Sequence, residues 1–178
     1  MFDVGDLVIY GNMGVCTITD ITIPDFCKVQ ERRQYYVLQP QNQGGTIFVP
    51  VDSNRVFIRS VITKEEADRI IDLIPTMQAE AYHTKVLQEL TQHYSEALHS
   101  HNCEDLIELV MSIYAKKQYR QQMNQKMGSV DENFMKRAEE LLYGELSSAL
   151  GIPQPSVPAY IASRVKAAEK KLAKAQTT

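Results

Sequence analysis

Two patterns of apolar and polar residues divide the chain near Ile62. Before that point, short apolar runs alternate with turn residues, which is typical of β-strands joined by tight turns. After it, apolar residues recur with helical spacing over long segments, which indicates amphipathic helices that pack against one another. The sequence therefore predicts an α+β protein, with a small β-domain over residues 1–62 and an all-helical domain over residues 63–178.

The β-domain is predicted to contain five short strands. Two glycines, Gly11 and Gly14, follow the first strand and allow the positive φ of a tight turn. Five strands in about sixty residues favour a small, strongly bent antiparallel barrel. The predicted strands are residues 6–10, 15–21, 33–38, 45–50 and 55–59.

Start and stop signals place the helices of the second domain. Thr63 and Glu66 form a capping box for the first helix, which stops before Pro75. A longer helix is expected over about residues 80–98, and Asn102 caps the next one. The predicted inward residues of these three helices are Ala67, Ile70, Ile71 and Ile74, then Val86, Leu87, Leu90, Tyr94 and Leu98, then Leu106, Leu109, Val110, Ile113 and Tyr114.

A second capping box, Ser129 with Glu132, opens a further helix that Gly151 is placed to end. Its predicted inward residues are Phe134, Ala138, Leu141, Leu142 and Leu146. A last helix begins near Pro158 and continues into a tail rich in alanine and lysine. The domain is thus expected to be a compact bundle of four or five helices.

Composition narrows the class of protein. A formal net charge of −3 argues against a generally basic nucleic-acid-binding protein. Any contact with phosphate would then be made by a local cluster of cations. The cysteines, Cys16, Cys27 and Cys103, are widely spaced and fit free thiols in a reducing compartment. With no apolar stretch long enough for a membrane span and no signal-like start, we expect a cytoplasmic protein with no membrane association, and nothing demands more than a monomer.

Catalytic motifs are missing from the sequence, since it contains no Gly-rich phosphate loop and no nucleophile elbow. The most tempting metal-ligand set is His93, His99, His101 and Cys103, which offers ligands that zinc prefers. These residues straddle a helix boundary where polar side chains are expected, and no second cysteine pair completes a tetrahedron. We therefore expect no enzyme activity, no metal and no other cofactor.

Several residues are candidates for contacts with macromolecules. Tyr35, Tyr36 and Phe48 form an aromatic patch or pack in the core, since successive strand residues point to opposite faces. Cations cluster on two predicted helices, at Lys116, Lys117, Arg120, Lys126, Lys136 and Arg137. They fit backbone phosphates if they share one face, and a mixed-charge helix surface is the equal alternative.

The order of motifs along both halves resembles the CarD/CdnL family of bacterial transcription regulators, up to about Arg164. The N-terminal motifs are Val4-Gly5-Asp6-Leu7-Val8-Ile9-Tyr10, Gly14-Val15, Tyr35-Tyr36-Val37-Leu38 and Val49-Pro50-Val51. The C-terminal motif is Ala138-Glu139-Glu140-Leu141-Leu142-Tyr143-Gly144-Glu145-Leu146. The resemblance implies a Tudor-like domain, similar to the polymerase-interacting module of transcription-repair coupling factors, followed by a helical domain that contacts promoter DNA and stabilises the open complex.

In that family the β-domain pairs an edge strand with the β subunit of RNA polymerase, a main-chain interaction that tolerates side-chain variation. The resemblance places this surface on Tyr35, Tyr36, Val37, Thr46, Ile47, Phe48, Val49 and Pro50. Known members carry an arginine where this chain has Phe48, so the charge-assisted part of the contact is missing or moved.

The family's helical domain inserts a tryptophan into the minor groove, and this chain has no tryptophan. Tyr82 and Leu87 are the candidate substitutes near that position. The full set expected to contact DNA, independently of its sequence, is Tyr82, Lys85, Leu87, Lys116, Lys117, Arg120, Lys136 and Arg137. The rival hypothesis is a protein–protein adaptor that binds polymerase or another partner without touching DNA.

Overall fold

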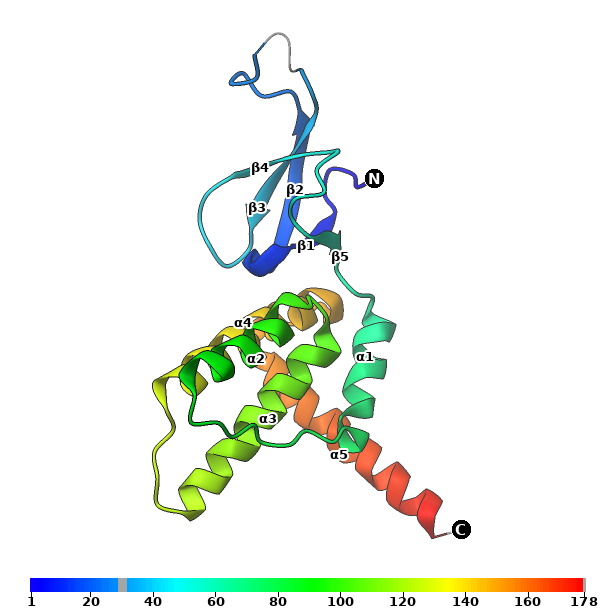
Figure 1. Ribbon diagram of the computed structural model, residues 1–178. Helices are drawn as coiled ribbons and strands as arrows, with labels where there is room; N and C mark the ends of the chain where they lie inside the picture. Colours follow the sequence, from blue (N-terminus) through cyan, green and yellow to red (C-terminus); the bar gives the residue numbers. More distant parts are fainter. Residues whose placement is uncertain (29–31, 178) are drawn as a thin grey trace. The chain divides into compact units, whose positions relative to one another are not determined.

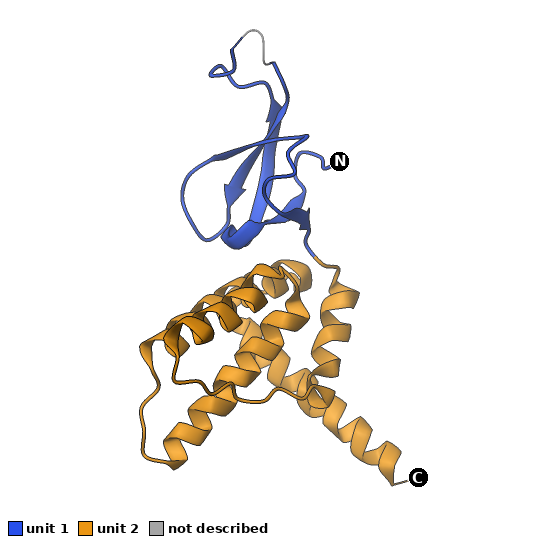
Figure 2. Cartoon of the chain, in the orientation of Figure 1, with its two compact units in different colours: residues 1–61 blue, residues 62–178 orange. Residues whose placement is uncertain are grey.

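The computed structural model describes residues 1–28 and 32–177. The chain forms two compact units, Met1–Val61 and Ile62–Thr178, which are coloured separately in Figure 2. The first contains the strands and the second contains the α-helices, so the predicted α+β class is confirmed.

The first unit is a five-stranded antiparallel sheet in the order β4-β3-β2-β1-β5 (Figure 1). Its strands are β1 (Leu7–Tyr10), β2 (Val15–Thr22), β3 (Tyr35–Pro40), β4 (Ile47–Pro50) and β5 (Ile58–Ser60). The tight turn after β1 contains Gly14 at φ 77°. The positive φ predicted from Gly11 and Gly14 is therefore confirmed. A register shift in β2 between Ile18 and Asp20 bends the sheet, as bulges do.

Alternate strand residues build the core of this unit. Its buried members are Val8, Cys16, Ile18, Tyr36, Leu38 and Val49. Burial raises the pKa of the Cys16 thiol to about 11, so this cysteine is a small apolar core residue at neutral pH.

The second unit contains five α-helices in its described residues, together with the short 3-10 helices η3 (Ile74–Thr76) and η4 (Gln154–Ser156) (Figure 1). The α-helices are α1 (Lys64–Leu73), α2 (Leu87–His99), α3 (Cys103–Gln122), α4 (Ser129–Leu150) and α5 (Val157–Gln176). None of the helices in the described ranges is long and apolar enough to cross a membrane.

Three predicted helix ends are confirmed. The Thr63 hydroxyl accepts a hydrogen bond from the Glu66 amide at 3.1 Å, and the Asn102 side chain accepts one from the Glu104 amide at 2.8 Å. Gly151 ends α4 in the left-handed conformation, with φ 66°. The core of the bundle contains residues from all five helices, including Ile71, Tyr94, Ile113, Leu146 and Val157.

The predicted start of α2 near residue 80 is wrong, because the helix begins at Leu87. A local turn precedes it: the Thr84 hydroxyl accepts a hydrogen bond from the Val86 amide at 3.1 Å and donates one to the Glu89 carboxylate at 2.9 Å. As a result Val86 and Leu87 are 48% and 63% exposed rather than buried as predicted.

Two other expectations are corrected. Ser129 is the first residue of α4 and Gly128 is its N-cap, without a side-chain cap, so the second capping box is wrong. Tyr114 was predicted to point inward and is 51% exposed. The remaining stripe of α3 is buried or packs against the core, through Leu106, Leu109, Val110 and Ile113.

Candidate functional site

Strand β4 lies at one end of the sheet order and is hydrogen-bonded to β3. In this pair, Tyr36 stands opposite Val49 and Val37 stands opposite Phe48. Among residues 1–28 and 32–177, no strand pairs with the other side of β4. Such an open strand edge is the kind of surface that accepts an added strand from another chain.

The hydrogen-bond pattern determines which groups this edge presents. The Val51 amide donates to the Gln34 carbonyl at 3.0 Å, so Val51 directs its backbone toward the β3 side. In an antiparallel pair, every second residue directs its backbone N–H and C=O to the neighbouring strand. The backbone groups of Val49 and Ile47 therefore also point to β3, and those of Phe48 point to the open side. The Pro50 carbonyl accepts the Ser53 amide at 3.0 Å, which caps the end of the edge.

The two faces of this part of the sheet have different environments. Tyr36 and Val49 are each 4% exposed and belong to the core. Tyr36 also accepts a hydrogen bond from the Phe2 amide through its hydroxyl, at 3.1 Å. Residues on the opposite face are half-buried or exposed, namely Tyr35, Val37, Phe48 and Pro50. Of the predicted contact residues, Phe48 is therefore accessible at 42% exposure, whereas the side chains of Tyr36 and Val49 are buried.

Phe26, which is not among the predicted contact residues, extends the outer face. This residue lies between β2 and β3, is 63% exposed, and meets both Phe48 and Tyr35 edge to face. The ring centroids are 5.3 Å and 5.8 Å away, respectively, which is the favoured range for aromatic pairs. The three rings form an exposed group, here called the aromatic ridge, beside the open edge. The available signal was a large apolar residue in the segment between the predicted strands 15–21 and 33–38.

A cation lies beside the aromatic ridge. The guanidinium of Arg33 is 6.0 Å from the centroid of the Tyr35 ring, and its NH1 is 4.0 Å from Asp52 Oδ1. Both charged side chains are more than half exposed, so this ion pair contributes little to stability. The pair places one positive and one negative side chain near the outer face.

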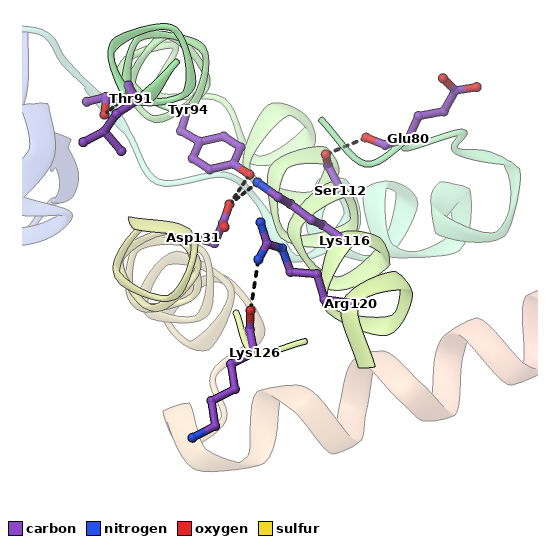
Figure 3. A network of polar contacts seen from close by, with 9 residues as sticks. Glu80, Thr91, Tyr94, Ser112, Lys116, Arg120, Lys126 and Asp131 are labelled. Carbon is purple, nitrogen blue, oxygen red and sulfur yellow. Dashed lines mark hydrogen bonds and ion pairs between the residues drawn. The ribbon is translucent and has the colours of Figure 1, made fainter. Parts of the chain in front are cut away.

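In the helical unit, Lys116 is not available for phosphate contact. It is 2% exposed, and its ammonium donates to Asp131 Oδ1 at 2.8 Å. The Tyr94 hydroxyl donates to the same oxygen at 2.7 Å (Figure 3). Burial, followed by the hydrogen bond to Asp131, raises the pKa of Tyr94. The prediction of Lys116 as a DNA ligand is therefore wrong, because a buried charge needs its partner.

The other predicted cations are not equally accessible. Lys117 and Lys136 are exposed on α3 and α4. Arg120 is half-buried, and its NH1 donates to the Lys126 carbonyl at 3.1 Å (Figure 3). Arg137 forms an ion pair with Glu140 on its own helix at 3.4 Å. The cluster thus offers fewer available charges than the sequence suggests.

The candidates near the start of α2 also differ in accessibility. The Tyr82 ring stacks on the His93 ring, with centroids 3.9 Å apart and planes inclined by 13°. His83 meets Tyr119 of α3 at 5.1 Å. Lys85 and Leu87 are exposed. Of the two candidate wedge residues, Leu87 is 63% exposed, whereas Tyr82 is half-buried and stacked on His93.

The histidines and cysteine of the zinc hypothesis have other contacts. His93 belongs to the stack with Tyr82, and the buried Cys103 thiol donates to Glu145 Oε2 at 3.1 Å. Glu145 Oε1 accepts the Ile62 amide at 3.2 Å. Within residues 1–28 and 32–177, no group of three or more potential ligands is arranged to hold a metal ion.

Comparison with protein families gives a match over residues 2–62. This segment is similar to the CarD-like/TRCF RID domain. The match spans nearly all of the first compact unit, with its five-stranded sheet, open β4 edge and aromatic ridge. No curated protein matches the chain. The match confirms the coarser part of the resemblance, a CarD-like/TRCF RID domain over residues 2–62, and the narrower assignment to the CarD/CdnL regulators stays a prediction.

Proposed function

We propose that this protein is a transcription regulator that binds RNA polymerase through the open β4 edge of its RID-like unit. The observation that carries this proposal is the position of β4 at the end of the strand order, with the Phe48 backbone directed away from β3, in a unit whose sequence matches the CarD-like/TRCF RID domain. The acquired strand comes from the β subunit of the polymerase, as the resemblance to the CarD/CdnL family implies.

In this mechanism, the Phe48 N–H donates to a carbonyl of the incoming strand and the Phe48 carbonyl accepts an amide from it. Main-chain pairing supplies affinity, and the side chains on the outer face of the sheet supply specificity. The aromatic ridge offers Phe26 and Phe48 to the apolar side chains of that strand. Aromatic and β-branched partners across a strand pair favour such contacts.

The protein acts as a binding module rather than as an enzyme, and it works in the cytoplasm as a monomer. Contact with promoter DNA, independent of its sequence, belongs to the helical unit. Leu87, Lys85, Lys117 and Lys136 are exposed for that contact, with Tyr82, Arg120 and Arg137 in supporting positions. Through these contacts the regulator modulates the stability of the open promoter complex.

The adaptor hypothesis is the second candidate. The burial of Lys116 favours it, because the helical unit then has fewer accessible cations for phosphate contact than predicted. An adaptor binds polymerase by the same β4 edge and uses its helices for a protein partner. The two candidates differ in one measurable property, since DNA contact by cations weakens steeply with salt and an apolar protein contact does not.

Titration of core RNA polymerase onto the immobilised full-length protein tests the shared part of both candidates. We expect saturable binding that the isolated β-subunit lobe displaces in full. Absence of binding, or binding that the lobe fails to displace, contradicts the assignment of the β4 edge to this partner. Repeating the titration with promoter DNA present, at low and moderate salt, then separates the regulator from the adaptor.

A further inference from the structure

We propose that the C-terminal half of α5 is an arm that binds the phosphate backbone of duplex DNA through one row of lysines. The residues of α5 that contact the core of the helical unit end at Val165. Beyond that residue the helix continues to Gln176, and its last turns extend past the other helices of the unit (Figure 1). This segment, residues 165–176, contains none of the residues predicted from the sequence to contact DNA.

The inward side of the arm is fixed by a row of residues spaced by four. Arg164 donates from Nε and NH2 to the Asp72 carboxylate of α1 at 2.9 Å and 2.6 Å. Ala168 and Leu172 continue this row and line a groove together with Leu73 and other residues of α1 and η3. The Arg164 pair, which also lowers the pKa of Asp72, therefore sets which side of α5 faces α1.

The outward side carries Lys166, Lys170 and Lys174, which are all exposed. Each follows a member of the inward row by two positions, which is a rotation of about 200° around a helix with 3.6 residues per turn. Residues four apart are about 6 Å apart along the axis and turn by only about 40° per step. The three ammonium groups thus form a continuous cationic row on the side of the helix that faces away from α1.

Charge distinguishes this arm from the rest of the protein. Residues 165–176 contain four lysines and one glutamate, which is a formal charge of +3. Because the whole chain has a net charge of −3, the rest of the chain has a net charge of −6. A polyanion is therefore attracted to this segment and repelled by the bulk of the chain.

The composition of the arm favours nucleic acid over other anionic partners. Leu172 is the single large apolar residue that follows Val165, and it faces the groove, so the arm lacks the apolar face that membrane-surface helices insert. Lysine is depleted in protein–protein interfaces, whereas lysine contacts to phosphate supply most non-specific DNA binding. Small alanines between the lysines also permit close approach to a backbone.

Fluorescence anisotropy with the full-length protein and a duplex of random sequence tests the proposal between 50 and 200 mM KCl. In the variant Lys166→Gln/Lys170→Gln/Lys174→Gln, glutamine retains helix propensity and removes the charge. We expect at least about a tenfold loss of affinity at the lowest salt, and a salt slope smaller by about 2 to 3, because each phosphate contact contributes roughly 0.9. Circular dichroism and polymerase binding should be unchanged.

A matched control variant, Arg55→Gln/Lys64→Gln/Arg69→Gln, removes the same charge from exposed residues elsewhere. Equal losses in both variants overturn the proposal, because net charge alone then explains binding. Unchanged affinity in the α5 variant overturns it as well, as does a loss confined to Lys85→Gln/Lys117→Gln/Lys136→Gln. Binding to phosphatidylserine vesicles without binding to the duplex assigns the arm to membranes and likewise contradicts the proposal.

Discussion

Lys116 Nζ lies 2.8 Å from Asp131 Oδ1, and each of these side chains is 3% exposed. The pair joins α3 to α4 inside the helical unit, and the Tyr94 hydroxyl of α2 completes it. Desolvation of either charge is tolerated only while the other is present. A lysine that the sequence suggests as a DNA ligand thus holds three helices together.

Replacing Lys116 with methionine is expected to destabilise the helical unit by about 3–5 kcal/mol, because Asp131 then remains as an unpaired buried charge. Urea unfolding followed by far-UV circular dichroism measures this change. Adding Asp131→Asn to Lys116→Met should recover a large part of the loss, since the amide is neutral and still accepts the Tyr94 hydroxyl. A loss below about 1 kcal/mol in the single variant contradicts the buried pair.

Tyr94 gives the helical unit a dependence on alkaline pH. Burial and the hydrogen bond to Asp131 raise the pKa of its phenol above the ordinary value of 10.0. The folded state therefore retains a proton that the unfolded state loses, so this contribution to stability is complete below pH 10 and decreases as the pH rises above it. Tyr94→Phe should show a shallower decline between pH 10 and 11 in urea titrations. Parallel curves would contradict this role.

Because α2 begins at Leu87, the two leucines at its start, Leu87 and Leu90, should contribute very differently to stability. Leu87→Ala should change the free energy of unfolding by less than about 0.5 kcal/mol, because the side chain is largely exposed. Leu90→Ala, one turn later at 6% exposure, removes core packing. It should cost about 2–5 kcal/mol. Equal effects at the two positions would indicate that the helix starts earlier and buries Leu87.

The aromatic ridge predicts a contribution of Phe26 to polymerase binding. Phe26→Ala should weaken the affinity for the β-subunit lobe by about 1–2 kcal/mol, which is typical of a partly buried aromatic contact. Phe57→Ala is the matched control, since Phe57 is 45% exposed and lies outside the ridge. Calorimetric titration compares the two. A similar loss in both variants would remove the ridge from the interface.

The sequence predicts the parts of the fold that depend on local signals. Strand alternation and the glycine turn give the five strands, and Thr63, Asn102 and Gly151 give helix ends, because each signal acts within one turn of the chain. Ser129 resembles an equally good cap, yet Asp131 of the same motif bonds Tyr94 and Lys116 from distant helices. These pairings join α4 to α2 and α3, and no local signal in the sequence indicates them.

The sequence likewise predicts only part of the candidate site. Family resemblance indicates the β4 segment, since main-chain pairing needs a strand and a register rather than particular side chains. Phe26 escapes prediction because its ring contacts with Tyr35 and Phe48 are tertiary contacts that no local pattern encodes. The cations of α3 and α4 look alike in sequence, and burial alone separates Lys116 from Lys117.

The most direct test of the central claim replaces Phe48 with proline, which deletes the one amide donor that the hydrogen-bond alternation directs to the open edge of β4. Proline is tolerated at an edge position whose N–H faces solvent, so the sheet should survive, as thermal unfolding would verify. Phe48→Ala retains the amide and serves as the comparison. Titration with the β-subunit lobe should show binding lost in the proline variant and only weakened in the alanine variant. Full binding by a folded Phe48→Pro protein would contradict strand addition at β4.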